Sequence, residues 1–548
     1  MRAVLEKLPV IFLDCQTTAA SPNSGHLLEV AWMRADGIED ISECSISIHS
    51  FVLSLPRGEE IPGRIAGMTG ITDEMVREGI DPEELVRLLE PALKGRLPVA
   101  HYAAFEARWL NDLLNRNSSG KGAELSMVCT REIARRLYPS IPRKGIRAVS
   151  GYLGHSMAEK KRSWEHVRAT ALIWRDQVQQ LKSRGVNTLG KLRDFLRETP
   201  PASQGSYIYP ISRKKRLSIS HEPGVYHLLA RDGKVLYVGK ATSMKSRVNS
   251  YFTRRSGSEK TLELVSQVHD VRTEECSTPL EAALLEIRRI KELDPPYNVA
   301  FRKKEGKVLF ISRDLRQFSP KPVGNGWFGP VHPLSPALLL ARIMDRLNGS
   351  AIMDPGTLGL DYAPLEEGAL ERGFEMVSRE VFQGGPVTRP ALLRTGRRIW
   401  MERKSDSEDK DEGEEVSKEE PLITGETVSA HLGYILARGV RDLMRGAWLR
   451  VLAWSSITWE AEGKGRRFLV LRRGLPAGSR WNPDPREVQS GVETAPVFSV
   501  MGRETFDRLR VLDSEVRRIV RNETIESLLT PAGKRLDRDK MVELYSLL

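Results

Sequence analysis

This sequence has few cysteines, no long apolar runs and no excess of acidic residues. Its 548 residues include four cysteines, and Cys15, Cys44, Cys129 and Cys276 show no paired spacing. That scatter argues against a zinc site or an iron–sulfur cluster and fits a reducing compartment. No stretch is long and apolar enough to span a bilayer, and no signal peptide is recognisable. We therefore expect a cytoplasmic protein with no membrane partner.

Basic residues are in excess, with 84 lysines and arginines against 72 aspartates and glutamates and a net charge of +12. The sequence pI of about 9.4 suits a polyanionic partner such as nucleic acid. A basic protein whose charges only solvate its surface has the same composition, so charge alone does not decide the partner. The length allows three or four domains with substantial cores.

The first 220 residues divide into a domain and a connector. Residues 1–182 alternate between strand-like runs, at 10–14 and 27–32, and helical periodicity, which predicts an α/β domain. The helical segments are 83–94, 104–116 and 165–182. Residues 183–220 are predicted to be a basic linker, and its run at 213–216 is either a phosphate-contacting stripe or, the favoured interpretation, a solvated segment.

Residues 221–302 contain the densest motif. The triplets Gly224-Val225-Tyr226 and Tyr237-Val238-Gly239 lie in two apolar runs, and Asp232-Gly233 between them is a strong hairpin signal. Strands joined in this way bring both tyrosines into one neighbourhood. Residues 281–292 have the periodicity of an amphipathic helix, which could deliver a carboxylate to the same place.

The remainder divides into three segments. Residues 303–403 contain Phe328-Gly329-Pro330 ahead of a predicted helix at 334–348. Residues 404–420 are so densely charged that we expect a disordered acidic loop. Residues 421–548 predict an α+β region without an assigned role. There we expect a helix at 426–444, strands at 447–454 and 467–472, and helices within 503–530.

Further residues extend the tyrosine motif in order along the chain. They include Ser246-Arg247-Val248-Asn249-Ser250-Tyr251-Phe252, Glu286 and Pro295-Pro296-Tyr297-Asn298-Val299. The set resembles the GIY-YIG endonuclease family, and within it the type found in the excision-repair nucleases UvrC and Cho. The resemblance implies a small α/β domain with a central antiparallel sheet. Residues 303–403 resemble, over a short stretch, the segment that follows this domain in UvrC.

The resemblance also implies roles. Glu286 would be the carboxylate ligand of one Mg²⁺ or Mn²⁺ ion, with Glu281 as the competing ligand. Tyr226 would be the general base, and Lys240 would lower the pKa of this phenol. Tyr237 would contact the attacking water or the phosphate, Arg247 would clamp the phosphate, Asn298 would complete the catalytic set, and Gly224 and Gly239 would allow close backbone approach.

The beginning of the chain resembles the DnaQ-like 3′–5′ exonuclease family, which implies an RNase H-like α/β fold. In place of the family's Asp-x-Glu motif stands Asp14-Cys15-Gln16, and a later motif retains a carboxylate at Glu106. The last motif aligns in two ways. Either His166 is the family histidine and Ala171 replaces the final aspartate, or Lys161 replaces the histidine and His166 the aspartate. Both leave the four-carboxylate set incomplete, so we expect a vestigial site that binds metal poorly.

Together these features predict a metal-dependent DNA endonuclease that makes single-strand incisions, in nucleotide excision repair by similarity to UvrC and Cho. The expected partner is DNA, and the repair context adds the damage-recognition proteins UvrA and UvrB as candidate partners, against which the two following absences count. We recognise neither the cysteine cluster of UvrC nor a helix–hairpin–helix signature, which favours a Cho-like partial enzyme. The alternatives are a non-catalytic DNA-binding or assembly scaffold and an active exonuclease.

Overall fold

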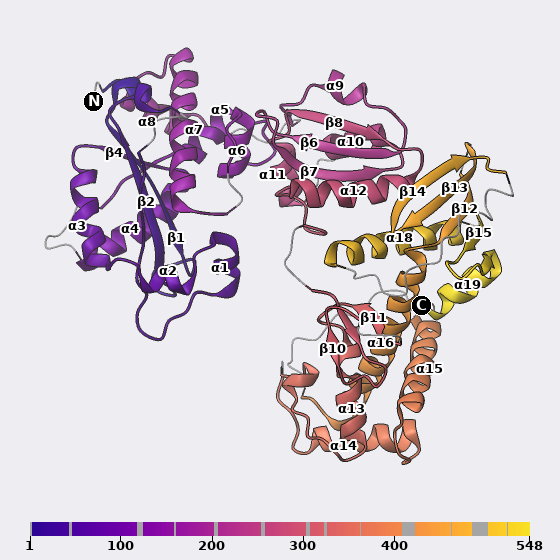
Figure 1. The fold of residues 1–548 in the computed structure, drawn as a ribbon. Helices are drawn as coiled ribbons and strands as arrows, with labels where there is room; N and C mark the ends of the chain where they lie inside the picture. Colours follow the sequence, from indigo (N-terminus) through magenta and orange to yellow (C-terminus); the bar gives the residue numbers. More distant parts are fainter. Residues whose placement is uncertain are drawn as a thin grey trace. The chain divides into compact units, whose positions relative to one another are not determined.

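The chain forms two compact units in the computed structural model (Figure 1). One contains Met1–Pro279 and Arg289–Arg302, and the other contains Leu280–Arg288 and Lys303–Leu548. No helix within the described part of the chain is long and apolar enough to cross a membrane. The structure describes residues 3–42, 47–117, 124–157, 160–201, 207–253, 258–302, 307–322, 326–361, 363–407, 422–461, 463–484, 502–522 and 524–548.

A five-stranded sheet organises the N-terminal part of the first unit. Its order is β3-β2-β1-β4-β5, in which β1, β2 and β3 pair antiparallel while β4 and β5 continue in parallel from β1. This is the RNase H-like α/β fold expected from the sequence. The strands are β1 (Val10–Thr17), β2 (Leu27–Ala35), β3 (His49–Val52), β4 (Leu97–Ala100) and β5 (Val128–Cys129). The helices are η1 (Leu5–Lys7), η2 (Ile38–Asp40), α1 (Gly63–Thr69), α2 (Asp73–Arg77), α3 (Pro82–Leu93), α4 (Ala103–Asn117), α5 (Thr130–Leu137), α6 (Ile146–Leu153), α7 (Ser163–Ser183) and α8 (Leu189–Glu198).

The continuous apolar run of β1 follows from burial of both sheet faces. Alternate residues of a strand point to opposite sides, so Val10 and Phe12 join one core cluster while Ile11 and Leu13 join another. Helix α8, from the segment predicted as a linker, packs Leu189 into the first of these clusters.

An ion pair anchors the start of α7 to β2. Glu29 is fully buried, and its carboxylate accepts hydrogen bonds from Arg162, at 2.6 Å, and from the backbone N–H of Ser163, at 2.8 Å. A carboxylate at a helix N-terminus satisfies free N–H groups and complements the helix dipole. This anchor holds His166, one turn later, at its place on the sheet.

A three-stranded antiparallel sheet of order β7-β6-β8 forms the second part of this unit. The predicted hairpin is present, with Gly233 in its turn at a φ of +84°, where glycine is favoured. The strands are β6 (Gly224–Leu229), β7 (Val235–Ala241) and β8 (Asp270–Glu275), and the helices are α9 (Arg213–Leu217), α10 (Met244–Thr253) and α11 (Glu259–Val265). The following helix, α12 (Pro279–Leu293), has residues in both units, with Leu280–Arg288 in the second. The sheet core unites Tyr226 and Leu228 of β6 with Met244 and Val248 of α10.

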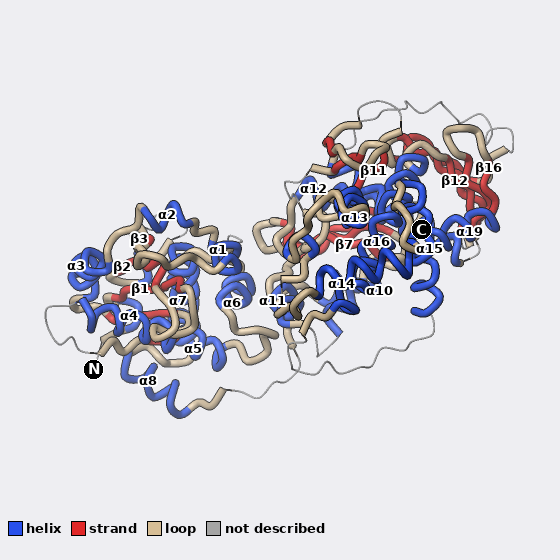
Figure 2. Tube along the Cα trace, turned by 90° about the horizontal axis from the view of Figure 1, so that it is seen from below, coloured by secondary structure: helices blue, strands red, loops and turns tan. Residues whose placement is uncertain are grey.

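The second unit has two sheets and a long helix, α16. The smaller sheet has the order β10-β9-β11 and the larger one β14-β13-β12-β15-β16. Figure 2 distinguishes the helices and strands by colour. The strands are β9 (Leu309–Ile311), β10 (Phe318–Ser319), β11 (Phe328–Val331), β12 (Ser456–Ala461), β13 (Gly465–Arg472), β14 (Leu475–Trp481), β15 (Ile525–Leu529) and β16 (Arg535–Asp537). The helices are η3 (Pro336–Leu339), α13 (Leu340–Leu347), η4 (Gly356–Leu358), α14 (Ala369–Met376), η5 (Val377–Val381), α15 (Arg389–Ser407), α16 (Gly425–Leu452), α18 (Arg503–Arg521) and α19 (Arg538–Leu547).

Three sequence-based expectations for this unit need correction or restriction. The strand expected at 447–454 is wrong, because α16 continues as a helix to Leu452. Helices were expected through 503–530, but α18 ends at Arg521 and 525–529 is the strand β15. Of the acidic loop expected at 404–420, residues 404–407 complete α15 and 408–420 lie outside the described residues.

Candidate active site

The hairpin places the two motif tyrosines on one face of the sheet. Tyr226 pairs with Gly239 and Tyr237 with Leu228, and the two tyrosine ring centroids are 6.2 Å apart. Directly opposed residues of an antiparallel pair lie on the same face. A Cβ atom on Gly239 would lie 2.4 Å from the hydroxyl oxygen of Tyr226, so glycine is required to make room for this hydroxyl.

The other motif glycine also permits a close approach. A Cβ on Gly224 would lie 2.3 Å from the carbonyl oxygen of Glu274 and 2.7 Å from the sulfur of Met244. Because the nearer atom belongs to the backbone of β8, a side chain here would force β6 and β8 apart. The expected role of Gly224, to allow close backbone approach, therefore has a geometric basis.

Tyr251 is a third member of the tyrosine cluster. No role was expected for this residue from the sequence. Its hydroxyl lies 3.0 Å from that of Tyr226, and its ring centroid is 6.2 Å from those of both Tyr226 and Tyr237. Arg247, one turn earlier in α10, lies over the Tyr251 ring at 5.2 Å. Arg247 and Tyr251 are four residues apart, a spacing that would place both side chains on one face of a helix, and this spacing is the signal that could have found Tyr251.

The environment of Tyr226 favours its neutral form. Its side chain is fully buried, and this burial raises the pKa of the Tyr226 phenol, as do the adjacent Tyr251 and Tyr237. The cation that opposes the rise in pKa is Arg247. The expectation that Lys240 lowers this pKa is therefore corrected. Lys240 pairs with Val225, which places it on the opposite face of the hairpin from Tyr226.

Asn298 braces β7. Its amide donates to the carbonyl of Val238 and accepts from the N–H of the same residue, both at 2.9 Å, and the Tyr297 N–H donates to the Leu236 carbonyl at 3.0 Å. Residues 297–298 thus satisfy polar groups of an edge strand, β7, on both sides of Tyr237. This geometry makes Asn298 a positioning residue, and its contribution to catalysis stays a prediction.

The candidate metal ligand lies on α12. Glu286 is half-buried in the middle of this helix. Residues 280–288 of the helix belong to the second unit, whereas Tyr226 belongs to the first. That Glu286 and Tyr226 act in one site therefore stays a prediction. Its competitor Glu281 is engaged in an ion pair with buried Arg467, which favours Glu286. Among the described residues no group of three potential His, Cys, Asp or Glu ligands exists. A single carboxylate fits a magnesium ion that also binds phosphate and water.

Gly239→Ala tests whether the Tyr226 hydroxyl must occupy this position. The new methyl group would displace the hydroxyl, and a shift of about 1 Å in a reacting group can cost about 100-fold in rate. We expect DNA nicking to fall by about that factor while circular dichroism and thermal melting stay near wild type. The matched control is Gly478→Ala in β14, where a Cβ meets no atom within 4 Å. Equal activity of the two variants would contradict this role of Gly239.

The vestigial exonuclease motif forms a second pocket, of about 390 Å³. In it, one oxygen of Asp14 accepts from the Gln16 amide at 2.9 Å, and the other lies 3.1 Å from Nδ1 of His166. Lys161 also lines this pocket, whereas Ala171 is buried in the core. The structure thus favours the second alignment, with His166 in place of the family aspartate.

The other retained acid of this pocket, Glu106, is buried. Burial, and then the negative Asp14, raise the pKa of Glu106 well above the usual value, and Glu106 accepts the Cys15 N–H at 2.8 Å. Nearby His101 bonds to Thr130 and to the Lys144 carbonyl, and burial lowers the pKa of His101 to about 3. Gln16 supplies no charge, and both retained carboxylates already accept hydrogen bonds, Asp14 from Gln16 and Glu106 from Cys15, so poor binding of a pair of divalent cations stays our prediction.

The expectation that this pocket binds metal poorly predicts that Asp14→Ala changes no nuclease activity. We expect no stepwise shortening of a 5′-labelled single strand by either wild type or Asp14→Ala in Mg²⁺ or Mn²⁺, as resolved on a sequencing gel. A product ladder that disappears in Asp14→Ala would show that the pocket is catalytic after all.

Comparison with known proteins agrees with both motif assignments. The family model for the UvrC-like GIY-YIG domain matches residues 222–299, and the model for the exonuclease family matches residues 11–166. A Mycobacterium tuberculosis relative named as a bifunctional exonuclease/endonuclease is 28% identical over 243 residues, or 43% of this chain and 36% of the relative. UvrABC system protein C from Psychrobacter sp. is 50% identical over 93 residues, or 17% of this chain and 15% of the relative.

Among solved structures, the N-terminal endonuclease domain of UvrC from Thermotoga maritima, bound to magnesium as its catalytic divalent cation, is 34% identical. The match covers 16% of this chain and 94% of that domain, with a TM-score of 0.15. The chain spans well under two thirds of the two curated relatives named above. Residues 222–299 are thus a UvrC-like GIY-YIG nuclease domain, joined in this chain to an N-terminal domain of the exonuclease family.

Proposed function

We propose that the chain is a metal-dependent DNA endonuclease that makes single-strand incisions through the site of Tyr226 and Glu286. The observation that carries this proposal is the tyrosine cluster beside Arg247, in which Gly239 leaves space for one catalytic hydroxyl. The exonuclease-like pocket, in contrast, lacks a usable set of carboxylates. One domain is thus equipped for phosphodiester hydrolysis while the other serves as a scaffold.

Hydrolysis requires a nucleophile, a proton acceptor and stabilisation of charge on the phosphate. Arg247 is suited to clamp two phosphoryl oxygens with its planar guanidinium group. Tyr226 in its phenolate form accepts the proton of the attacking water, and Tyr237 orients that water or the phosphate. Glu286 would hold the Mg²⁺ or Mn²⁺ ion, which when bound supplies Lewis-acid stabilisation of the phosphoryl oxygens.

The repair context is a finer part of the proposal. Similarity to the UvrC nuclease domain supports incision next to a lesion in nucleotide excision repair, with damage-recognition proteins such as UvrA and UvrB as partners. The net charge of +12 fits a DNA substrate. A nuclease domain alone does not determine the substrate.

The test is to incubate the purified protein with an end-labelled lesion-bearing duplex and with the same duplex undamaged. Each is supplied with Mg²⁺, Mn²⁺ or a chelator. We expect one nick in the lesion-bearing strand that requires the divalent cation. Tight DNA binding without cleavage under every condition, with or without damage-recognition proteins, would instead support a scaffold.

A further inference from the structure

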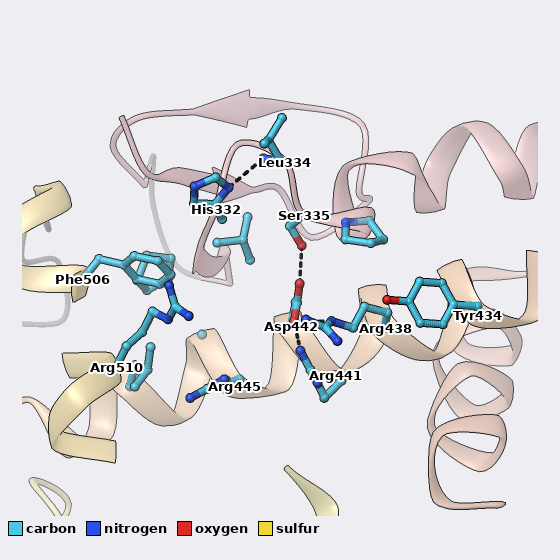
Figure 3. A pocket seen from close by; sticks show the side chains of 15 residues that line it. His332, Leu334, Ser335, Tyr434, Arg438, Arg441, Asp442, Arg445, Phe506 and Arg510 are labelled. Carbon is cyan, nitrogen blue, oxygen red and sulfur yellow. Dashed lines mark hydrogen bonds and ion pairs between the residues drawn. The ribbon is translucent and has the colours of Figure 1, made fainter. Parts of the chain in front are cut away.

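The second unit contains a cationic groove that the GIY-YIG site does not use. A cavity of about 450 Å³ lies between α16, α18 and the loop after β11. Its lining includes four arginines and a single acidic residue, Asp442. We call Arg438, Arg441 and Arg445 of α16, together with Arg510 of α18, the arginine groove (Figure 3).

The arginines form a row because of their spacing. Tyr434, Arg438, Arg441 and Arg445 follow one another at intervals of three or four residues, which places them on one face of α16. At 1.5 Å per residue the row is about 16 Å long, which is enough for several successive phosphates of one strand. Figure 3 shows Tyr434 at one end of the row and Arg510 with Phe506 at the other.

The positive charge of the groove is only partly compensated. Asp442 accepts from Ser335 at 2.7 Å and from Arg441 at 3.0 Å, and Asp513 pairs with Arg445 at 3.0 Å. Arg510 forms no hydrogen bond or ion pair with another described residue, and its guanidinium carbon lies 5.9 Å from the centroid of the Phe506 ring. Even with neighbouring Arg503 and Asp507 included, five arginines face three carboxylates.

Two further observations concern the guanidinium groups of the groove. The Nε–H groups of Arg441 and Arg445 are buried and have no hydrogen-bond acceptor among the described residues, as is also true of several arginines outside the groove. Burial, with the nearby cation Arg445, also lowers the pKa of both Arg441 and Arg510. A bound anion would satisfy the donors and offset the mutual repulsion of these cations.

The rim supplies surfaces for unstacked bases. Tyr434 is 44% exposed and Leu334 is 86% exposed, both beside the groove. Aromatic faces next to a basic track are the pattern of single-strand binding sites, where bases stack while arginines contact the backbone. We propose that the arginine groove binds a single strand of nucleic acid, with phosphates on its arginines and a base on Tyr434. Identification of that strand as DNA rests on the proposed function.

The test measures anisotropy of a labelled single-stranded oligonucleotide with the full-length protein in a chelator, so that cleavage cannot intervene. The double variant R438Q/R510Q removes one charge whose ion pair with Asp442 is long, at 3.9 Å, and one charge without an ion pair to a described residue. We expect its affinity to fall about tenfold or more and its salt dependence, as log K against log salt, to flatten by about 1.4. The control R397Q/R535Q removes two exposed arginines elsewhere in this unit and should bind like wild type.

Equal binding by the groove variant and the control would overturn the proposal. So would competition by inorganic phosphate or thymidine monophosphate as effective as that by the oligonucleotide, since this would indicate a small phosphorylated ligand. Tyr434→Ala should weaken binding of the single strand but not of a duplex, and an equal effect on both would contradict base stacking. Glu286→Gln should bind like wild type, so failure of nicking and failure of this groove remain distinguishable.

Discussion

Glu286→Gln is expected to reduce DNA nicking by about 10³-fold or more while leaving DNA binding intact. The amide has nearly the same shape but no charge, and a divalent cation held by one protein carboxylate would lose its only anionic protein ligand. Loss of several kcal/mol of Lewis-acid stabilisation corresponds to this factor in rate. The measurement is the single-turnover rate on a nicked-product gel over a range of Mg²⁺ concentrations.

The matched control for this variant is Glu292→Gln, a charge-neutralising change on the same helix. Glu292 pairs with Arg289 at 2.7 Å and is half-exposed, so its removal should change the rate less than twofold. If Glu286→Gln nicked DNA like this control, the metal would have to be held elsewhere, and the assignment of Glu286 would be wrong.

Tyr226→Phe is expected to cause the second large loss of DNA nicking rate. The substitution keeps the buried ring and deletes the hydroxyl that accepts the proton, and loss of such a group costs about 10²–10⁴-fold in rate. Because burial raises the pKa of Tyr226, the deprotonated fraction is small at neutral pH and grows tenfold with each pH unit. The wild-type rate should therefore rise across the neutral and mildly alkaline range, and the residual rate of Tyr226→Phe should not.

Tyr251→Phe is the control, because it removes the neighbouring hydroxyl at 3.0 Å but leaves that of Tyr226 in place. It should slow nicking less than Tyr226→Phe and retain the rise with pH. If Tyr226→Phe nicked DNA within twofold of the wild-type rate, or if its rate rose with pH as the wild-type rate does, Tyr226 would be excluded as the base.

Local signals predicted the architecture of the nuclease domain well. The Asp232-Gly233 turn and two apolar runs sufficed to pair β6 with β7, and amphipathic periodicity identified α12. Neither signal could show why Gly239 is glycine, because the hydroxyl that needs this space comes from the partner strand. Lys240 was misplaced for the related reason that sequence proximity does not reveal which face of a strand a side chain occupies.

The misread end of α16 has a different cause. The first part of this helix contributes residues such as Leu432 and Leu436 to one core cluster, while Trp448 and Leu452 belong to another. A helix that changes the core it faces, and is apolar on several sides near its end, loses the simple 3.6-residue pattern. The run at 447–454 therefore resembled a buried strand.

In the exonuclease-like domain, one feature of the site could be predicted from the sequence and another could not. Replacement of an acid by Gln16 could be recognised in the sequence, and it already argued against a two-metal site. Which residue would face Asp14 could not be decided, because both alignments around His166 fit the residue pattern. Only the folded sheet and the anchored start of α7 bring His166 within 3.1 Å of Asp14.

The most direct test of the central claim is a product analysis of wild type, Glu286→Gln and Asp14→Ala on one lesion-bearing duplex in Mg²⁺. High-resolution gels distinguish a single internal nick from stepwise shortening. We expect the same single nick for wild type and Asp14→Ala and intact DNA for Glu286→Gln. Cleavage that survives Glu286→Gln but is lost in Asp14→Ala would contradict this expectation and transfer the activity to the N-terminal domain.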